Sequence, residues 1–155
     1  MKNKFLSSSI ALWCSVAIAL ATVLFFVFGK YRFYAYGAYT FRLFSFSGIA
    51  LAVLFGAWML ATARKFHIKL RELQDIEARL DAYCKQYRRI YWLGFAAVLL
   101  LSACIVLSNN NSLIMLLLVL VLMLFFLHPN MYKAKVDLAL SNEDMHALFG
   151  DRFIE

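Results

Sequence analysis

The first long apolar stretch of the chain, residues 5–28, reads FLSSSIALWCSVAIALATVLFFVF and decides the class of fold. It holds 24 residues without an Asp, Glu, Lys or Arg, and a helix needs about 20 apolar residues to cross the hydrocarbon core of a bilayer. Because lipid offers no partner for backbone N–H and C=O groups, such a run is expected to be helical. It exceeds the apolar part of a typical signal peptide, about 7–15 residues, so we interpret it as an uncleaved anchor.

Three further uncharged runs follow, at residues 43–63, 90–107 and 112–128. Their lengths of 21, 18 and 17 residues fall within the range of about 17–25 that transmembrane helices occupy. They lack the polar–apolar alternation of membrane barrel strands. The apolar share of 64% also exceeds the roughly 45–50% of soluble domains. The predicted fold is therefore an all-α integral membrane protein with four transmembrane helices in residues 1–128 and a tail in residues 129–155.

The basic residues predict how these runs are threaded. Of the 16 lysines and arginines, three lie in the first connection, eight in the second and none in the third, residues 108–111. The others lie at the two ends of the chain. Because cytoplasmic segments are enriched in Lys and Arg, we predict that both termini and the second connection are cytoplasmic. The small size and the short outer turn suit a bacterial inner membrane.

The charged second connection, residues 64–89, has a helical pattern of its own. It contains no glycine or proline, and its apolar residues recur at helical spacing, which predicts a long amphipathic cytoplasmic helix. Three fates stay open: it lies in the headgroup layer, extends the neighbouring spans as a hairpin, or pairs in a coiled coil. Its apolar stripe, a candidate surface for a partner or the membrane, is Phe66, Leu70, Leu73, Ile76, Leu80, Tyr83 and Tyr87.

The tail begins at Pro129, which is expected to stop the fourth helix. Next, Val136, Leu138 and Leu140 alternate with other residues, a weak signal for an extended segment. Such a segment would connect the last span to the end of the chain.

Further along the tail, Ser141 is followed three residues later by Asp144, a pattern that resembles a capping box. Gly150 suits a helix stop. These signals predict a short helix over residues 142–149. Its apolar side, which either docks on the protein itself or binds a partner, consists of Met145, Leu148 and Phe149.

Small residues repeat every four positions in the first and second runs, which lets helices approach closely in lipid. We therefore predict that these two spans pack against each other through Ser7, Ala11, Ser15, Ala19, Gly48, Ala52 and Gly56. The fourth run has no such stripe and is expected at the periphery.

The net charge of +7 lies mostly beside the predicted spans. Attraction to anionic headgroups, about 1 kcal/mol per basic residue near the surface, explains it more simply than nucleic-acid binding, which we do not expect. The residues assigned to headgroups are Arg64, Lys65, Lys69, Arg71, Arg88 and Arg89.

No pattern in the chain points to catalysis, a metal or a cofactor. No acid, base or histidine lies deep within a predicted span, where transporters and pumps place ionisable groups. Cys14, Cys84 and Cys104 have no metal-ligand spacing, and we interpret them as free thiols.

We therefore expect a non-catalytic accessory, scaffold or regulatory subunit of a membrane complex. It would dock a protein partner or a second copy through the amphipathic helix and the tail. The alternative is a small self-assembling channel or transporter with an uncharged pore.

Overall fold

The computed structural model describes residues 2–28, 38–71, 75–108, 110, 112–129 and 131–149. Within these residues it describes the backbone, but not the side chains, of 2–5, 26, 38–40, 63, 64, 67–69, 71, 131 and 146–149. The aromatic-rich part of the first connection, at 29–37, lies outside the described residues.

All secondary structure in the described part of the chain is helical. The elements are α1 (Lys2–Phe28), α2 (Ala38–Arg71), α3 (Ile76–Ser108), α4 (Ser112–Phe126), α5 (Met131–Leu138) and α6 (Asn142–Phe149). The helices α1, α2 and α3 are long and apolar enough to cross a membrane. The predicted all-helical class is confirmed, and the three apolar helices indicate a membrane-embedded protein.

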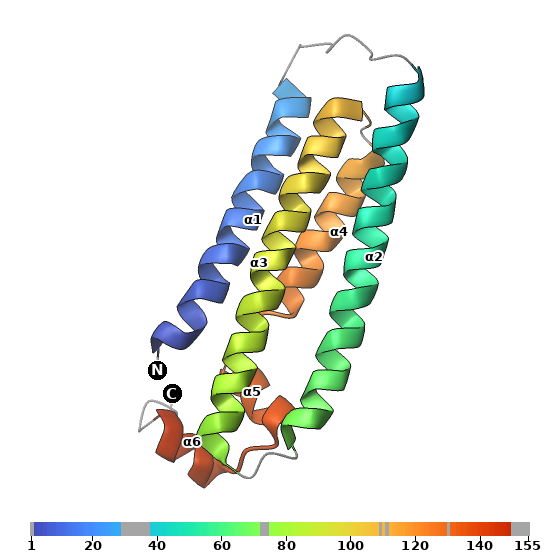
Figure 1. Cartoon of the computed structure of the whole chain (residues 1–155). Helices are drawn as coiled ribbons and strands as arrows, with labels where there is room; N and C mark the ends of the chain where they lie inside the picture. The colour runs from blue at the N-terminus through green and yellow to red at the C-terminus, as the bar shows by residue number, and fades with distance from the viewer. Residues whose placement is uncertain are drawn as a thin grey trace.

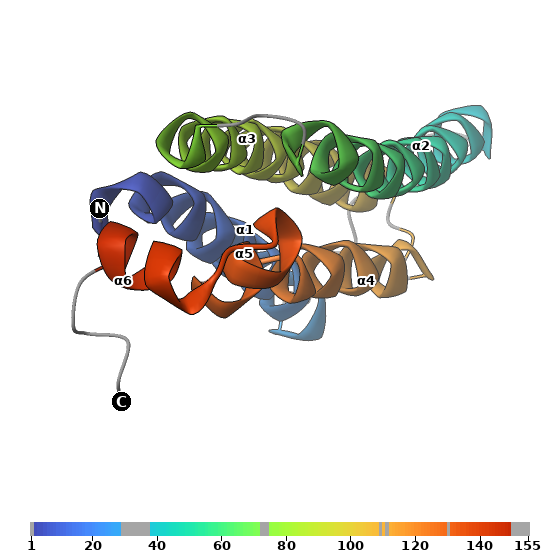
Figure 2. The same cartoon turned by 90° about the horizontal axis from the view of Figure 1, so that it is seen from below.

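The four long helices form a bundle in which α3 and α4 separate α1 from α2 (Figures 1 and 2). The main contacts of α1 are with α3 and α4, and those of α2 are with α3, α4 and α5. The prediction that the first and second spans pack against each other is therefore wrong. Small residues show which face of a helix is close-packed, but any neighbour with matching side chains can fill that face.

The small residues do lie on the packed faces of their helices. Ala11, Ser15 and Ala19 of α1 are buried, and so are Gly48, Ala52 and Gly56 of α2. A Cβ atom built at Gly48 would lie 3.2 Å from methyl carbons of both Leu101 and Leu113. Ser7, at the end of the stripe, is half-buried. Close approach of α2 to α3 and α4 at Gly48 thus requires a residue without a side chain.

The helix α4 is a partner of all three other long helices rather than a peripheral one. Its buried side chains recur at helical spacing and include Leu113, Leu117, Leu120 and Leu124. The opposite side exposes Met115, Leu122 and Phe126. The expectation that α4 sits at the periphery was based on its lack of small residues, but interlocking leucines bury one of its faces equally well.

Polar contacts mark one level of the bundle, near the start of α1. Trp92 donates its indole N–H to Ser7 Oγ at 3.0 Å, and Ser9 Oγ lies 3.0 Å from His128 Nε2. Tyr91 donates its hydroxyl to the Leu124 carbonyl. These contacts join α1, α3 and the end of α4, and we call them the polar layer.

Both α2 and α3 continue past the polar layer. The predicted single helix over residues 64–89 is wrong, because these residues are divided between the end of α2 and the start of α3. Of the three fates considered, the structure has the hairpin: α2 ends at Arg71 and α3 begins at Ile76. An unbroken helix of 26 residues would span about 39 Å and could not return the chain to the bundle. Asp75 accepts a hydrogen bond from the Glu77 backbone N–H at 3.1 Å and so caps the start of α3.

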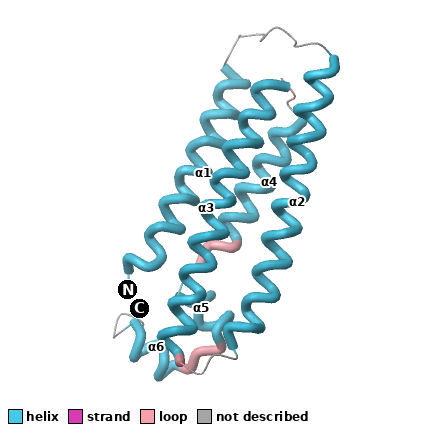
Figure 3. The backbone as a smooth tube through the Cα atoms, in the orientation of Figure 1, coloured by secondary structure: helices cyan, strands magenta, loops and turns pink. Residues whose placement is uncertain are grey.

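The tail packs against the end of this hairpin (Figure 1). Figure 3 shows the short loop after α4 beside α3, followed by α5 and α6. We call this part of the protein the head: the ends of α2 and α3 that flank residues 72–74, with α5 and α6.

The helix α5 replaces the extended segment predicted around Val136, Leu138 and Leu140, so that prediction is wrong. The helix ends in a left-handed residue, Ala139, with φ of 51°. The Leu140 N–H then donates to the Lys135 carbonyl at 3.0 Å, as in a Schellman motif. Glycine usually occupies such a position, and alanine there concealed the end of the helix.

Replacement of Ala139 by glycine is expected to stabilise the head by about 1 kcal/mol, because it relieves the cost of a left-handed L-residue. The free energy of unfolding in detergent measures this. As a control, Ala78→Gly on an exposed part of α3 is expected to destabilise by about 1 kcal/mol. A loss of stability with Ala139→Gly would contradict the assigned backbone conformation.

The helix α6 covers the residues expected from the capping pattern. The Ser141 N–H donates to the Asp144 carboxylate at 2.8 Å, and the Asp144 N–H donates to Ser141 Oγ at 3.0 Å. The first bond, with smaller help from Arg79, holds the pKa of Asp144 below its usual value. Since the folded pKa is lowered, this contribution to stability is present at neutral pH and lost as the pH falls through that pKa.

Candidate functional site

The head buries most of the apolar stripe that the sequence offered as a partner surface. Leu70, Leu80, Tyr83 and Tyr87 are almost fully buried, and so is Met145 of α6. Phe66 and Ile76 are partly buried against the same core. Leu73 lies outside the described residues, as do the side chains of Leu148 and Phe149. The tail thus docks on the protein's own hairpin.

A column of three tyrosines runs along α3 from the head to the polar layer. Tyr83, Tyr87 and Tyr91 follow one another at every fourth position of α3, and all three are buried. The ring centroids of Tyr83 and Tyr87 are 4.6 Å apart, and those of Tyr87 and Tyr91 are 6.5 Å apart. Stacked aromatic rings at this spacing bury a large apolar area while their hydroxyls still need partners.

The tail supplies partners for this part of α3. Tyr83 donates its hydroxyl to Asp137 Oδ2 of α5 at 2.9 Å, and Asp137 also interacts with Tyr87. Arg79 donates to the Leu138 carbonyl at 3.3 Å, one of the carbonyls at the end of α5. Bonds to charged groups are stronger than neutral ones, so Asp137 and Arg79 hold the tail in one position.

Neither Asp137 nor Arg79 was among the site residues predicted from the sequence. Both are charged residues in segments rich in charge, and nothing in the spacing shows that the tail returns to α3. Only that return brings Asp137 to Tyr83 and Arg79 to the Leu138 carbonyl. A buried tyrosine hydroxyl in a predicted apolar stripe was the available signal, because such a group requires a hydrogen-bond partner.

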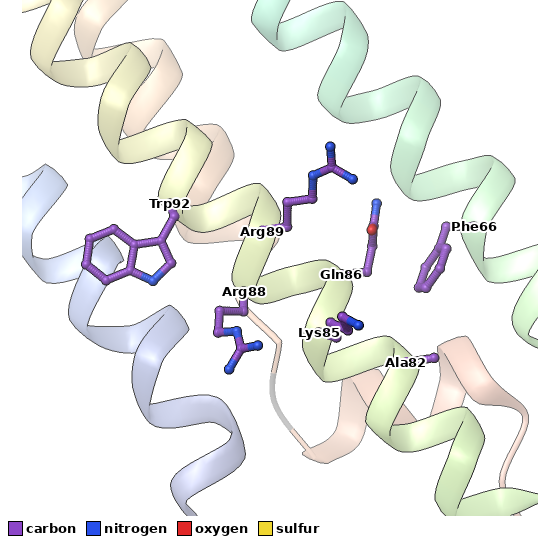
Figure 4. Close-up of a pocket in the computed structure, with 7 residues that line it drawn as sticks. All are labelled: Phe66, Ala82, Lys85, Gln86, Arg88, Arg89 and Trp92. Carbon is purple, nitrogen blue, oxygen red and sulfur yellow. The ribbon is translucent and has the colours of Figure 1, made fainter.

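A second feature is a groove on the outer side of α3, bordered by α2 (Figure 4). Its volume is about 390 Å³. Figure 4 shows Trp92 on the side of α1, and Arg89 and Gln86 on the side of Phe66 from α2. The lining residues are Phe66, Ala82, Lys85, Gln86, Arg88, Arg89 and Trp92. We call this feature the basic groove.

The structure brings together only some of the residues assigned to lipid headgroups. Arg88 and Arg89 line the basic groove and are exposed. Lys65 is exposed on α2 but does not line it. The side chains of Arg64, Lys69 and Arg71 lie outside the described residues. Lys85, which the sequence analysis did not assign to headgroups, joins the two arginines.

Elsewhere, no group of three or more His, Cys, Asp or Glu residues that could hold a metal ion occurs in the part of the chain that the structure describes. The three cysteines are free, as the sequence indicated; Cys84 is buried and Cys14 is exposed.

No family model matches the sequence, and no curated protein and no solved structure matches the chain. The residues and their geometry therefore carry the argument about function.

Proposed function

We propose that this protein is a non-catalytic accessory subunit of a membrane complex, with four spans, cytoplasmic termini and a partner docked on its head. A bacterial inner membrane suits its small size. The observation that carries the proposal is the outer face of α5, where Tyr132 and Val136 are 65% and 71% exposed. They lie one helical turn apart, and this apolar pair is in the head rather than in the apolar bundle.

The position of α4 supports four crossings. Its 15 residues span about 22 Å, less than the roughly 30 Å hydrocarbon core. However, α4 runs back along α3 (Figure 1), and the Leu124 carbonyl meets Tyr91 in the polar layer. Tyr91 stands at the start of the apolar run of α3. The apolar run of α3 and the helix α4 therefore reach the same depth at this end, which supports a bilayer that covers both.

The two ends of the described chain support cytoplasmic termini on one side. The start of α1 and the helix α6 lie at the same end of the bundle (Figure 1). That end carries the second connection, which holds eight of the 16 basic residues. The positive-inside bias therefore favours a cytoplasmic position for this end.

A photo-crosslinking amino acid at Tyr132 or Val136 tests the proposal in native membranes. We expect one protein adduct of constant mass from either position. The matched control is Leu54, which is 70% exposed on the bundle and should react with lipid. In addition, Val136→Lys should abolish the adduct from position 132 without lowering the melting temperature.

Two outcomes would contradict this proposal. One is lipid adducts from positions 132 and 136 equal to those from position 54. The other is ion conduction or solute transport by the purified protein alone in liposomes, which would favour the channel.

A further inference from the structure

The basic groove has one sign of charge. Lys85, Arg88 and Arg89 lie at helical spacing on a single face of α3 and are all exposed. The other described lining residues are apolar or, in the case of Gln86, a neutral amide, and no acidic side chain is among them. Three clustered cations with no acid among the lining residues create a positive potential that attracts an anion, and arginines bind phosphate oxygens through paired hydrogen bonds.

The groove lies where the apolar part of the bundle ends. On α2, the apolar stretch ends at Thr62, and Phe66 follows one turn later. On α3, Arg88 and Arg89 directly precede the uncharged run that begins at residue 90. Trp92 belongs to the polar layer through its bond to Ser7, and tryptophan is enriched at the level of lipid headgroups.

The same face of α3 continues as an apolar surface. Three to four residues beyond Arg89 lie Trp92 and Leu93, and one and two turns further lie Ala96 and Leu100, all exposed. Residues at these intervals share one face of a helix. A ligand in the groove therefore meets cations at one end and an exposed apolar strip at the other.

We propose that the basic groove binds an anionic glycerophospholipid, with its phosphate held by Lys85, Arg88 and Arg89 and an acyl chain along Leu93 and Leu100. The positive charge of the groove and its position at the end of the apolar part of the bundle favour this occupant. A soluble phosphate compound would use the cations but leave the apolar strip uncovered. The lipid site goes beyond the docking proposed above and does not depend on it.

Binding to the purified full-length protein tests the inference. The probe is a fluorescent phosphatidylglycerol titrated into the protein in neutral detergent, with phosphatidylcholine as the zwitterionic comparison. We expect Arg88→Gln with Arg89→Gln to weaken phosphatidylglycerol binding about tenfold or more and to leave phosphatidylcholine binding unchanged. The matched control is Arg42→Gln with Lys65→Gln, which removes the same charge from exposed positions on α2 outside the groove. We expect that control to change affinity by less than about threefold.

Further measurements separate the sources of the phosphate and the effects of folding. Free glycerol phosphate at millimolar concentration should not displace the lipid; displacement would show a soluble ligand and overturn the proposal. Equal losses in the two double variants would show diffuse attraction between the basic protein and the anionic lipid and also overturn it. Leu100→Gln alters the strip without removing a charge and should weaken binding of long-chain more than short-chain phosphatidylglycerol. Only variants whose melting temperature equals that of the wild type are compared. Unchanged phosphatidylglycerol affinity in all groove variants would contradict the site.

Discussion

Replacement of Gly94 by leucine is expected to lower the free energy of unfolding by about 3 kcal/mol, the upper part of the range for overpacked sites. A Cβ atom at Gly94 would lie 2.7 Å from one methyl carbon of Leu124 and 3.0 Å from the other. Leu124 is fully buried, and its carbonyl accepts the Tyr91 hydroxyl. The side chain of Leu124 therefore has little room to move, and α3 and α4 must separate.

Unfolding in mixed detergent, followed by far-UV circular dichroism, measures this loss. The matched control is Gly56→Ala, because a Cβ there meets only Met123 Sδ at 3.8 Å, an ordinary contact. We expect that control to be neutral or to stabilise by up to about 1 kcal/mol through helix propensity.

A rescue experiment assigns the effect to one contact. Gly94→Ala should destabilise the wild-type protein but should cost less in a Leu124→Ala background, where the clashing methyl groups are gone. Equal costs in both backgrounds, or a Gly94→Leu protein as stable as wild type, would contradict the packing of α4 on α3.

Replacement of Asp137 by alanine is expected to release the tail and to cost about 1–3 kcal/mol, because it leaves a buried hydroxyl without its acceptor. Tyr83, the donor, is fully buried. Trypsin should then cleave after Lys133 and Lys135 faster than in the wild type, and amide exchange across α5 should accelerate.

Two variants separate the hydrogen bond from other roles of Asp137. Asp137→Asn keeps an oxygen acceptor and should retain most of the protection. In a double-mutant cycle, Tyr83→Phe should reduce the cost of Asp137→Ala, because the unsatisfied hydroxyl has been removed. If the costs simply add, the bond between Tyr83 and Asp137 does not hold the tail.

The sequence predicted the elements of this fold better than their partners. Uncharged runs identified the three long apolar helices, because the requirement to bond the backbone internally acts on each run separately. The pattern of Ser141 and Asp144 located α6 for a similar reason, since its capping bonds are local. By contrast, the close-packed side of Gly48 was visible, but its neighbours Leu101 and Leu113 were not.

In the candidate sites, too, the sequence predicted single residues but not their partners. Arg88 and Arg89 stood out as basic residues beside a span, but the groove needs Phe66 from another helix. Tyr83 was recognised as part of an apolar stripe, whereas its partner Asp137 lies 54 positions away. Pairings across such distances depend on how the hairpin and the tail fold back, which no local pattern records.

The central claim is a bundle that crosses the bilayer four times, with the head in the cytoplasm. Cysteine labelling in intact cells tests it most directly, with a membrane-impermeant maleimide and a background in which Cys14, Cys84 and Cys104 are alanine. Ser112→Cys and Glu143→Cys probe exposed positions at the start of α4 and at the start of α6. Four crossings with a cytoplasmic head predict labelling of position 112 from outside, and of position 143 only after the cells are permeabilised. Labelling of position 143 in intact cells would contradict it.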